Sequence, residues 1–258
     1  MKIHAEWLGG TLRRQPNRAR AVNKWPSIIQ EWLYPPTCLL CGDPGCDGVD
    51  LCLSCREALP FISRACPRCA LPVAAAEPQL CNACRTNPPA FHAAFAPLRY
   101  EEPVGHLVRS LKFAARYPAA RLLGTLLSEQ LAGRADQPEA ILPVPLHAAR
   151  YRERGYNQVI EIARTASRRL GVPLDLDACR RVRATSAQAQ LAAVERRKNL
   201  RGAFAVRAAE LPYGHVAILD DVVTTGSTVN ELARTLRAAG VARVDVWACA
   251  RAGRASGA

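Results

Sequence analysis

The chain has 258 residues, of which 49% are hydrophobic and 22% charged, enough apolar material for one large domain or two smaller ones. No apolar run reaches the roughly 18 residues of a membrane-spanning helix. The basic N-terminus lacks the apolar segment of a secretory signal, so the sequence predicts a cytoplasmic protein without a membrane span. The formal charge is +13, but only four of the 35 basic residues are lysines, an arginine-rich and alanine-rich bias that is typical of a GC-rich genome. Charge alone therefore leaves nucleic-acid binding open without favouring it.

The first organised segment is rich in cysteine, with nine of the eleven cysteines between Cys38 and Cys84. Eight of them form four Cys-x-x-Cys pairs, separated by ten, ten and eleven residues. Two such pairs can surround one Zn²⁺ with four thiolates, an arrangement closed to water and therefore structural. The sequence thus predicts two zinc sites, with the ligands Cys38, Cys41, Cys52, Cys55, Cys66, Cys69, Cys81 and Cys84.

Other interpretations of the cysteines are weaker or stay open. A redox Cys-x-x-Cys usually occurs singly beside a βαβ pattern, and the cytosolic thiol pool would keep these residues reduced. Pairing of neighbouring motifs is simpler than an interleaved arrangement, but spacing allows both. Cys46 is left over and could substitute for a neighbour. Such zinc would fold a short polar segment or present a docking surface.

From Phe91 onward, patterns of strands and helices alternate, which is typical of an α/β fold with a mostly parallel sheet. We expect this region to have a hydrophobic core separate from that of the cysteine segment. The expected elements are a short strand at 95–100, helices at 104–111 and 119–131, a buried strand at 140–144, an arginine-bearing loop, a helix at 157–170, a strand at 203–207, a central strand at 215–221, a helix at 228–239 and a final strand at 243–250.

The central strand ends in two carboxylates, Asp220 and Asp221, followed by Thr-Thr-Gly-Ser-Thr at a helix start. Burying carboxylates is unfavourable unless they are paired or bound. Gly226 lets the backbone approach a ligand closely, and the N–H groups and hydroxyls at the helix start favour a phosphate. A simple helix cap explains one hydroxyl but not two carboxylates. The stretch therefore predicts a ribose 5-phosphate site whose acids accept hydrogen bonds from sugar hydroxyls and help to hold Mg²⁺.

The stretch ILDDVVTTGSTV resembles the phosphoribosyl pyrophosphate (PRPP) signature of type I phosphoribosyltransferases. From about Trp32 the chain is similar to the ComF family, through YPPTCLLCG, LKF, PVPLHAARYRERGYNQ and ERRKNLRGAF. This resemblance implies a type I phosphoribosyltransferase fold at 91–258 and a zinc-binding module at 32–90. The basic N-terminus at 1–31 falls outside it and is either disordered or the result of a translation start assigned too far upstream. The resemblance also implies a role in natural competence and DNA uptake.

The resemblance assigns the parts of PRPP to particular residues. Asp220 and Asp221 hold the ribose hydroxyls and are the catalytic pair. The 5-phosphate binds to Thr224, Thr225, Gly226, Ser227 and Thr228. The pyrophosphate binds to Arg150, Arg152 and Arg154, since arginine forks suit phosphate oxygens, although a solvated basic face is the alternative.

Three further assignments depend on the same resemblance. The segment 184–204 looks like a mobile hood over PRPP, in which Gln188, Arg196, Arg197, Lys198 and Asn199 could reach the ligand, but helix-surface charge explains them equally well. Lys112 and Phe113 could line an acceptor pocket, and core packing explains Phe113 equally well. Purine-salvage relatives carry a third Asp at the position of Thr224, so its absence weakens a purine-salvage role.

The predicted reaction is displacement of pyrophosphate from C1 of PRPP by an unidentified acceptor. Mg²⁺ and the arginines would stabilise the leaving group, and no dedicated general base is evident. Two alternatives stay open, because a fold does not determine a function. One is a non-catalytic PRPP sensor whose zinc module docks DNA-uptake proteins. The other is a single-stranded DNA-binding protein of the uptake machinery.

Overall fold

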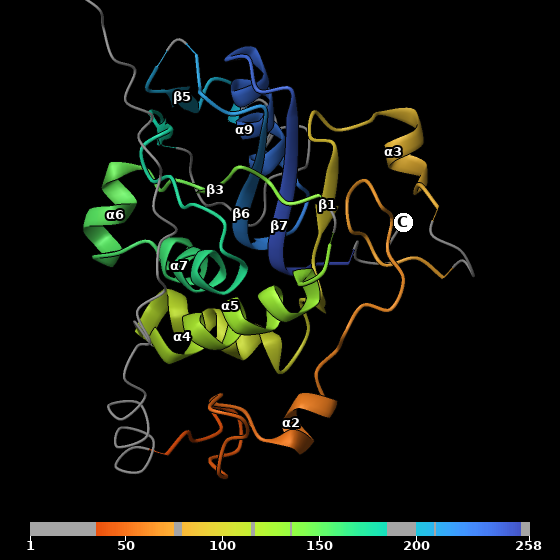
Figure 1. Ribbon diagram of the computed structural model, residues 1–258, viewed down its shortest axis with the longest axis vertical. Coiled ribbons are helices and arrows are strands. Elements are labelled where there is room, and N and C mark those ends of the chain that lie inside the picture. Colours follow the sequence, from red (N-terminus) through yellow and green to blue (C-terminus); the bar gives the residue numbers. More distant parts are fainter. Residues whose placement is uncertain are drawn as a thin grey trace, which may run out of the picture. The chain divides into compact units, whose positions relative to one another are not determined.

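A parallel sheet forms the centre of the C-terminal part of the chain (Figure 1). The computed structural model describes residues 35–74, 79–114, 117–134, 136–184, 200–208 and 210–253, apart from the side chains of residues 112–114. Across the sheet the order is β1 (Ala93–Phe95), β7 (Arg243–Arg251), β6 (His215–Val223) and β3 (Ala140–Pro143), and all neighbouring strands run parallel. A short strand, β2 (Leu98–Arg99), pairs with β7 farther along the edge that β1 occupies.

The strand β6 is central, as predicted, because apolar side chains cover both of its faces. Val216, Ala217, Ile218 and Leu219 are all fully buried. Val216 and Ile218 belong to one hydrophobic cluster, whereas Ala217 and Leu219 belong to the other. This alternation follows from the period of two residues in a strand, and burial on both faces explains the unbroken apolar run.

Helices cover the two faces of the sheet (Figure 1). On one side, α4 (Val104–Ala114), α5 (Tyr117–Leu131) and α7 (Gln158–Leu170) share a hydrophobic cluster with Ala217 and Leu219. On the other side, α9 (Ser227–Ala238) packs against Val216 and Ile218. These helices agree with the predicted apolar spacing, and the α/β fold class is confirmed. None of the helices in the described part of the chain is long and apolar enough to cross a membrane.

The arginine-bearing segment after β3 is a helix, so the prediction of a loop is wrong. This helix, α6 (Ala148–Arg154), begins after His147, whose Nδ1 accepts a hydrogen bond from the N–H of Ala149 at 3.2 Å. It ends at Gly155, where φ is 80°. Pro143 and Pro145 end the strand, but they precede the helix and so do not interrupt it. Alanine, arginine and glutamate in the segment favour a helical backbone.

Two predicted strands also differ from the observed ones. The strand expected at 95–100 is divided into β1 and β2. The strand expected at 203–207 is β5 (Phe204–Val206), but it pairs antiparallel with β4 (Cys179–Arg181) in a separate two-stranded sheet. The sequence gives little indication of β4, because only Cys179 of its three residues is buried.

The cysteine segment shares an apolar core with the helices, so the expectation of separate cores is wrong. Its helices are α2 (Leu53–Glu57), which follows Cys52, and α3 (Asn82–Thr86), which follows Cys81. Leu51 and Leu59 belong to the same cluster as α4, α5 and α7. A segment this short has too few apolar side chains to bury them among themselves.

The close packing of α5 on α7 depends on Gly124. A Cβ atom at this position would lie 2.8 Å from the carbonyl oxygen of Ile162 on α7. We expect Gly124→Val to lower the free energy of unfolding by about 1–3 kcal/mol, because a helix backbone cannot yield locally. Gln130→Val, on the exposed side of α5, is the matched control and should change it by about 0.5 kcal/mol or less. Urea denaturation measures both values, and equal effects would contradict the packing argument.

Candidate functional site

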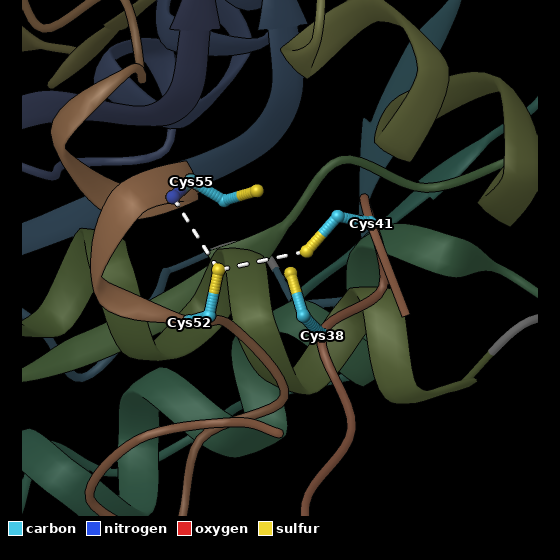
Figure 2. Close-up of side chains that lie close together, drawn as sticks. All are labelled: Cys38, Cys41, Cys52 and Cys55. Carbon is cyan, nitrogen blue, oxygen red and sulfur yellow. Dashed lines mark hydrogen bonds between the residues drawn. The ribbon is translucent and has the colours of Figure 1, made fainter. Parts of the chain in front are cut away.

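The first cysteine cluster brings together four sulfur atoms from two neighbouring Cys-x-x-Cys motifs (Figure 2). The Sγ atoms of Cys38, Cys41, Cys52 and Cys55 all lie within 4.8 Å of one another. The Sγ atoms of Cys41 and Cys52 are 3.6 Å apart. Tetrahedral zinc with Zn–S bonds of about 2.3 Å places its sulfurs about 3.8 Å apart. The cluster therefore fits a structural zinc ion.

The second cluster repeats this arrangement with the other two motifs. The Sγ atoms of Cys66, Cys69, Cys81 and Cys84 lie within 4.8 Å of one another, and those of Cys69 and Cys81 are 3.7 Å apart. The motifs thus pair sequentially rather than in an interleaved order. Cys46 is exposed and belongs to neither cluster.

Each cluster contains a thiol that ionises readily. Burial raises the pKa of Cys66, but hydrogen bonds from the backbone of Cys81, Cys69 and Arg68 outweigh burial and lower this pKa to about 7. In the same way, burial raises the pKa of Cys38, and backbone hydrogen bonds bring it down to about 6. Since the thiolate is the metal ligand, these N–H groups favour metal binding.

The two carboxylates at the end of β6 have different surroundings. Asp221 is only 5% exposed, and its Oδ2 accepts a hydrogen bond from Nε2 of Gln158 at 3.0 Å. Asp220 is partly exposed. Successive side chains of a strand point to opposite faces, so the two acids do not share one orientation. Asp221 is held from the side of α7, whereas Asp220 is accessible at the strand end.

One of the predicted pyrophosphate residues, Arg154, is joined to Asp221 through Gln158. Nη1 of Arg154 donates a hydrogen bond to Oε1 of Gln158 at 2.7 Å, and Gln158 in turn donates to Asp221. Arg150 is partly buried, and Arg152 is exposed. The sequence argument did not select Gln158, although its place at the start of a helix in the GYNQ stretch was a signal.

A fourth arginine, Arg181 on β4, lies close enough to Arg150 and Asp220 for their charges to affect its pKa. Burial lowers the pKa of Arg181, the charge of Arg150 lowers it further, and Asp220 opposes these effects. Pairing of β4 with β5, together with a parallel bridge between His147 and Arg181, brings this arginine close to the start of α6. Sequence reasoning missed Arg181, because β4 itself was not recognised.

The Thr-Thr-Gly-Ser turn opens α9, and within it the N–H of Ser227 donates a long hydrogen bond of 3.4 Å to Oγ1 of Thr225. Gly226 adopts a left-handed conformation with a φ of 76°, and no side chain caps the helix from this position. Oγ1 of Thr225 and Oγ of Ser227 are 2.9 Å apart, and Thr224 and Thr225 are exposed. Hydroxyls beside the N-terminus of a twelve-residue helix suit a phosphate.

A cavity of about 750 Å³ separates this turn from the second cysteine cluster. Its walls include Thr224, Thr225, Ser227, Cys81, Asn82 and Arg251. The predicted hood residues Gln188, Arg196, Arg197, Lys198 and Asn199 lie outside the described residues, as do the side chains of Lys112 and Phe113.

The chain is similar to several known proteins. Residues 29–85 match the double zinc ribbon domain family. The chain is 38% identical to DNA utilization protein YhgH of Salmonella typhimurium over 84% of this chain and 97% of that protein. It is 40% identical to competence protein F of Haemophilus influenzae over 67% of this chain and 79% of that protein. Among solved structures, a glutamine PRPP amidotransferase from B. subtilis is 20% identical over 52% of this chain and 26% of that chain, with a TM-score of 0.35.

We expect the purified chain to contain two zinc ions, because each cluster supplies a complete set of four thiolates. Cys52→Ser and Cys69→Ser should each remove one ion, whereas Cys46→Ser, outside both clusters, should keep two. Elemental analysis of the purified proteins measures this content. Fewer than one zinc per wild-type chain would contradict the assignment.

Proposed function

We propose that this chain, which belongs to the ComF family of competence and DNA utilization proteins, binds PRPP with Mg²⁺ and transfers its phosphoribosyl group, in support of DNA uptake. The reaction would release pyrophosphate to solvent and join C1 of the ribose to an acceptor. The proposal depends on one observation above all: two carboxylates and a hydroxyl-rich turn at a helix N-terminus follow one another at the carboxyl end of β6. Ligands of open α/β sheets bind at this end.

Three sets of residues would each bind a different part of PRPP. The N–H groups and hydroxyls of residues 224–228 would hold the 5-phosphate. Asp220, which is the more exposed acid, would accept hydrogen bonds from the ribose hydroxyls, with Asp221 beside it. The arginines of α6, together with Arg181, would face the pyrophosphate. Carboxylate and phosphate oxygens are ligands that Mg²⁺ prefers, so the acids and PRPP would hold the ion together.

Transfer would break the bond between C1 and the pyrophosphate oxygen while the acceptor bonds to C1. The transition state carries positive charge on the ribose and negative charge on the leaving group. Bound Mg²⁺ would neutralise part of the pyrophosphate charge. Arg150, Arg152, Arg154 and Arg181 would stabilise the rest. Of these, Arg154 is held in place by its hydrogen bond to Gln158, and a charge that is oriented in advance stabilises a transition state more effectively.

A second candidate function is binding of single-stranded DNA at α6. Tyr151 on α6 and Tyr117 at the start of α5 are each 50% exposed, and Arg152, which follows Tyr151, is exposed as well. Tyr117 also packs against Tyr156, with ring centroids 5.6 Å apart. Exposed aromatic rings among arginines are typical of surfaces on which bases stack.

Three results distinguish the candidate functions. Release of pyrophosphate that depends on an added nucleobase or amine supports the transferase. Binding of PRPP without release of pyrophosphate, whichever acceptor is added, supports a sensor. Binding of single-stranded DNA that persists at physiological salt and weakens in Tyr151→Ala supports the third function.

Replacing Asp220 tests the ribose contact. Asp220→Asn keeps the size of the side chain and removes its charge, so PRPP affinity should fall by about tenfold or more, as expected when hydrogen bonds to a charged acceptor are lost. Calorimetric titration with PRPP and Mg²⁺ measures the affinity. The melting temperature without ligand should hardly change, because Asp220 is partly exposed. Unaltered affinity would show that Asp220 does not contact the ligand.

A pair of variants separates the phosphate turn from the arginine helix. Thr225→Val removes a hydroxyl donor and should lower the affinity for both PRPP and ribose 5-phosphate. Arg152→Ala should lower the affinity for PRPP but not for ribose 5-phosphate, which has no pyrophosphate. Titration of each variant with both ligands measures the four affinities. If both variants weaken both ligands equally, the assignment of the two subsites is wrong.

A further inference from the structure

A buried arginine, Arg251, connects the second cysteine cluster to the turn proposed to hold the 5-phosphate. The residue is 6% exposed and ends β7. Its Nε donates a hydrogen bond to the carbonyl oxygen of Cys69 at 2.9 Å. Its Nη1 donates to the carbonyl oxygen of Val223 at 2.9 Å and also reaches that of Thr224. One guanidinium thus joins a cysteine of the second cluster to the last residue of β6 and the first residue of the turn.

The sheet holds the backbone of this arginine in place. Arg251 is the register partner of Val223 on β6 and of Arg99 on β2. The N–H of Ala252 donates to the carbonyl oxygen of Val223 at 3.0 Å, and the N–H of Tyr100 donates to that of Arg251 at 3.0 Å. Because the strands fix its Cα position, the side chain can hold the turn and the cysteine motif at a constant distance.

The position of the Cys69 carbonyl in turn depends on the fold of its metal-binding motif. Ala70, the next residue, has a left-handed φ of 56°, and its N–H donates to the carbonyl oxygen of Cys66 at 2.8 Å. A non-glycine residue in this conformation is strained and needs surrounding structure to maintain it. Four thiolates around one metal ion would supply that structure.

In the described part of the chain, residues next to the first cluster form ion pairs with α5 rather than with the phosphate turn. Arg56, next to Cys55, pairs with Glu129 of α5 at 2.6 Å. Asp50, near Cys52, pairs with Arg121 of the same helix at 3.3 Å. The first cluster thus contacts the helices that cover the sheet, whereas the second cluster contacts the phosphate turn through Arg251 and lines the same cavity as that turn. The two clusters therefore offer a matched comparison within one chain.

We infer that Arg251 is a positioning residue for the phosphate turn, and that metal loading of the second cluster, not of the first, sets the affinity for ligands bearing a 5-phosphate. This inference rests on the proposed PRPP site. When the carbonyl of Thr224 is held, the N–H groups that follow are oriented before the ligand arrives. Without this restraint, binding must also order the turn, which weakens affinity.

The test uses the full chain and three ligands: PRPP, ribose 5-phosphate and pyrophosphate, each titrated with Mg²⁺. Arg251→Met should lower the affinity for PRPP and for ribose 5-phosphate by about tenfold, the loss expected when charge-assisted hydrogen bonds are removed. The affinity for pyrophosphate should stay within about twofold of the wild-type value. Arg251→Lys keeps a cation and should restore part of the affinity. Arg56→Met, which breaks one of the two ion pairs between the first-cluster segment and α5, is the control and should leave the affinity for all three ligands unchanged.

The cysteine variants test the same connection from the metal side. Cys69→Ser and Cys52→Ser should each lose one zinc, but only Cys69→Ser should lower the affinity for ribose 5-phosphate. This pair decides the matter if Arg251→Met does not fold. Equal affinities in Cys69→Ser and Cys52→Ser, or wild-type affinity in a folded Arg251→Met, would overturn the inference. If the wild-type chain binds neither PRPP nor ribose 5-phosphate, the proposed function fails instead.

Discussion

The parallel pairing of β6 with β7 determines where the two acids, the turn that opens α9 and Arg251 lie. The two strands run in register from His215 and Arg243 to Val223 and Arg251, and their middle residues are buried on both faces. The two acids of β6 come after its apolar residues, toward its carboxyl end. The acids, the turn that opens α9, and Arg251 all lie at this end, so the geometry of the site follows from the apolar packing beneath it.

The buried polar groups at this end are satisfied by residues from distant segments. Asp221 receives a hydrogen bond from Gln158, which also accepts one from Arg154, while Arg251 donates to backbone carbonyls of both β6 and the cysteine segment. Burial of such groups is tolerated only when each has a partner. The same partners restrain the groups that would contact PRPP, so stability and preorganisation of the site arise from the same contacts.

The double zinc ribbon is part of the fold rather than an appendage to it. Its first cluster shares a hydrophobic core with α4, α5 and α7, and its second cluster lines the cavity beside the turn that opens α9. A short cysteine segment gains little from its own apolar contacts, so metal ligation and packing on the neighbouring helices complement each other.

The sequence alone determined the features that depend on neighbouring residues. These are the eight cysteines that form the two clusters, the buried central strand, and the order of acids, turn and helix after it. Motif spacing and hydrophobic periodicity depend on residues that are near one another in the chain. Only the tertiary structure decided which motifs share a metal, that the arginines lie on α6, and that Gln158, Arg181 and Arg251 belong near the site. The hydrogen bond from Gln158 to Asp221 spans 63 residues, and that from Arg251 to Cys69 spans 182. Contacts of this kind follow from strand order, register and side-chain direction, which no local pattern encodes.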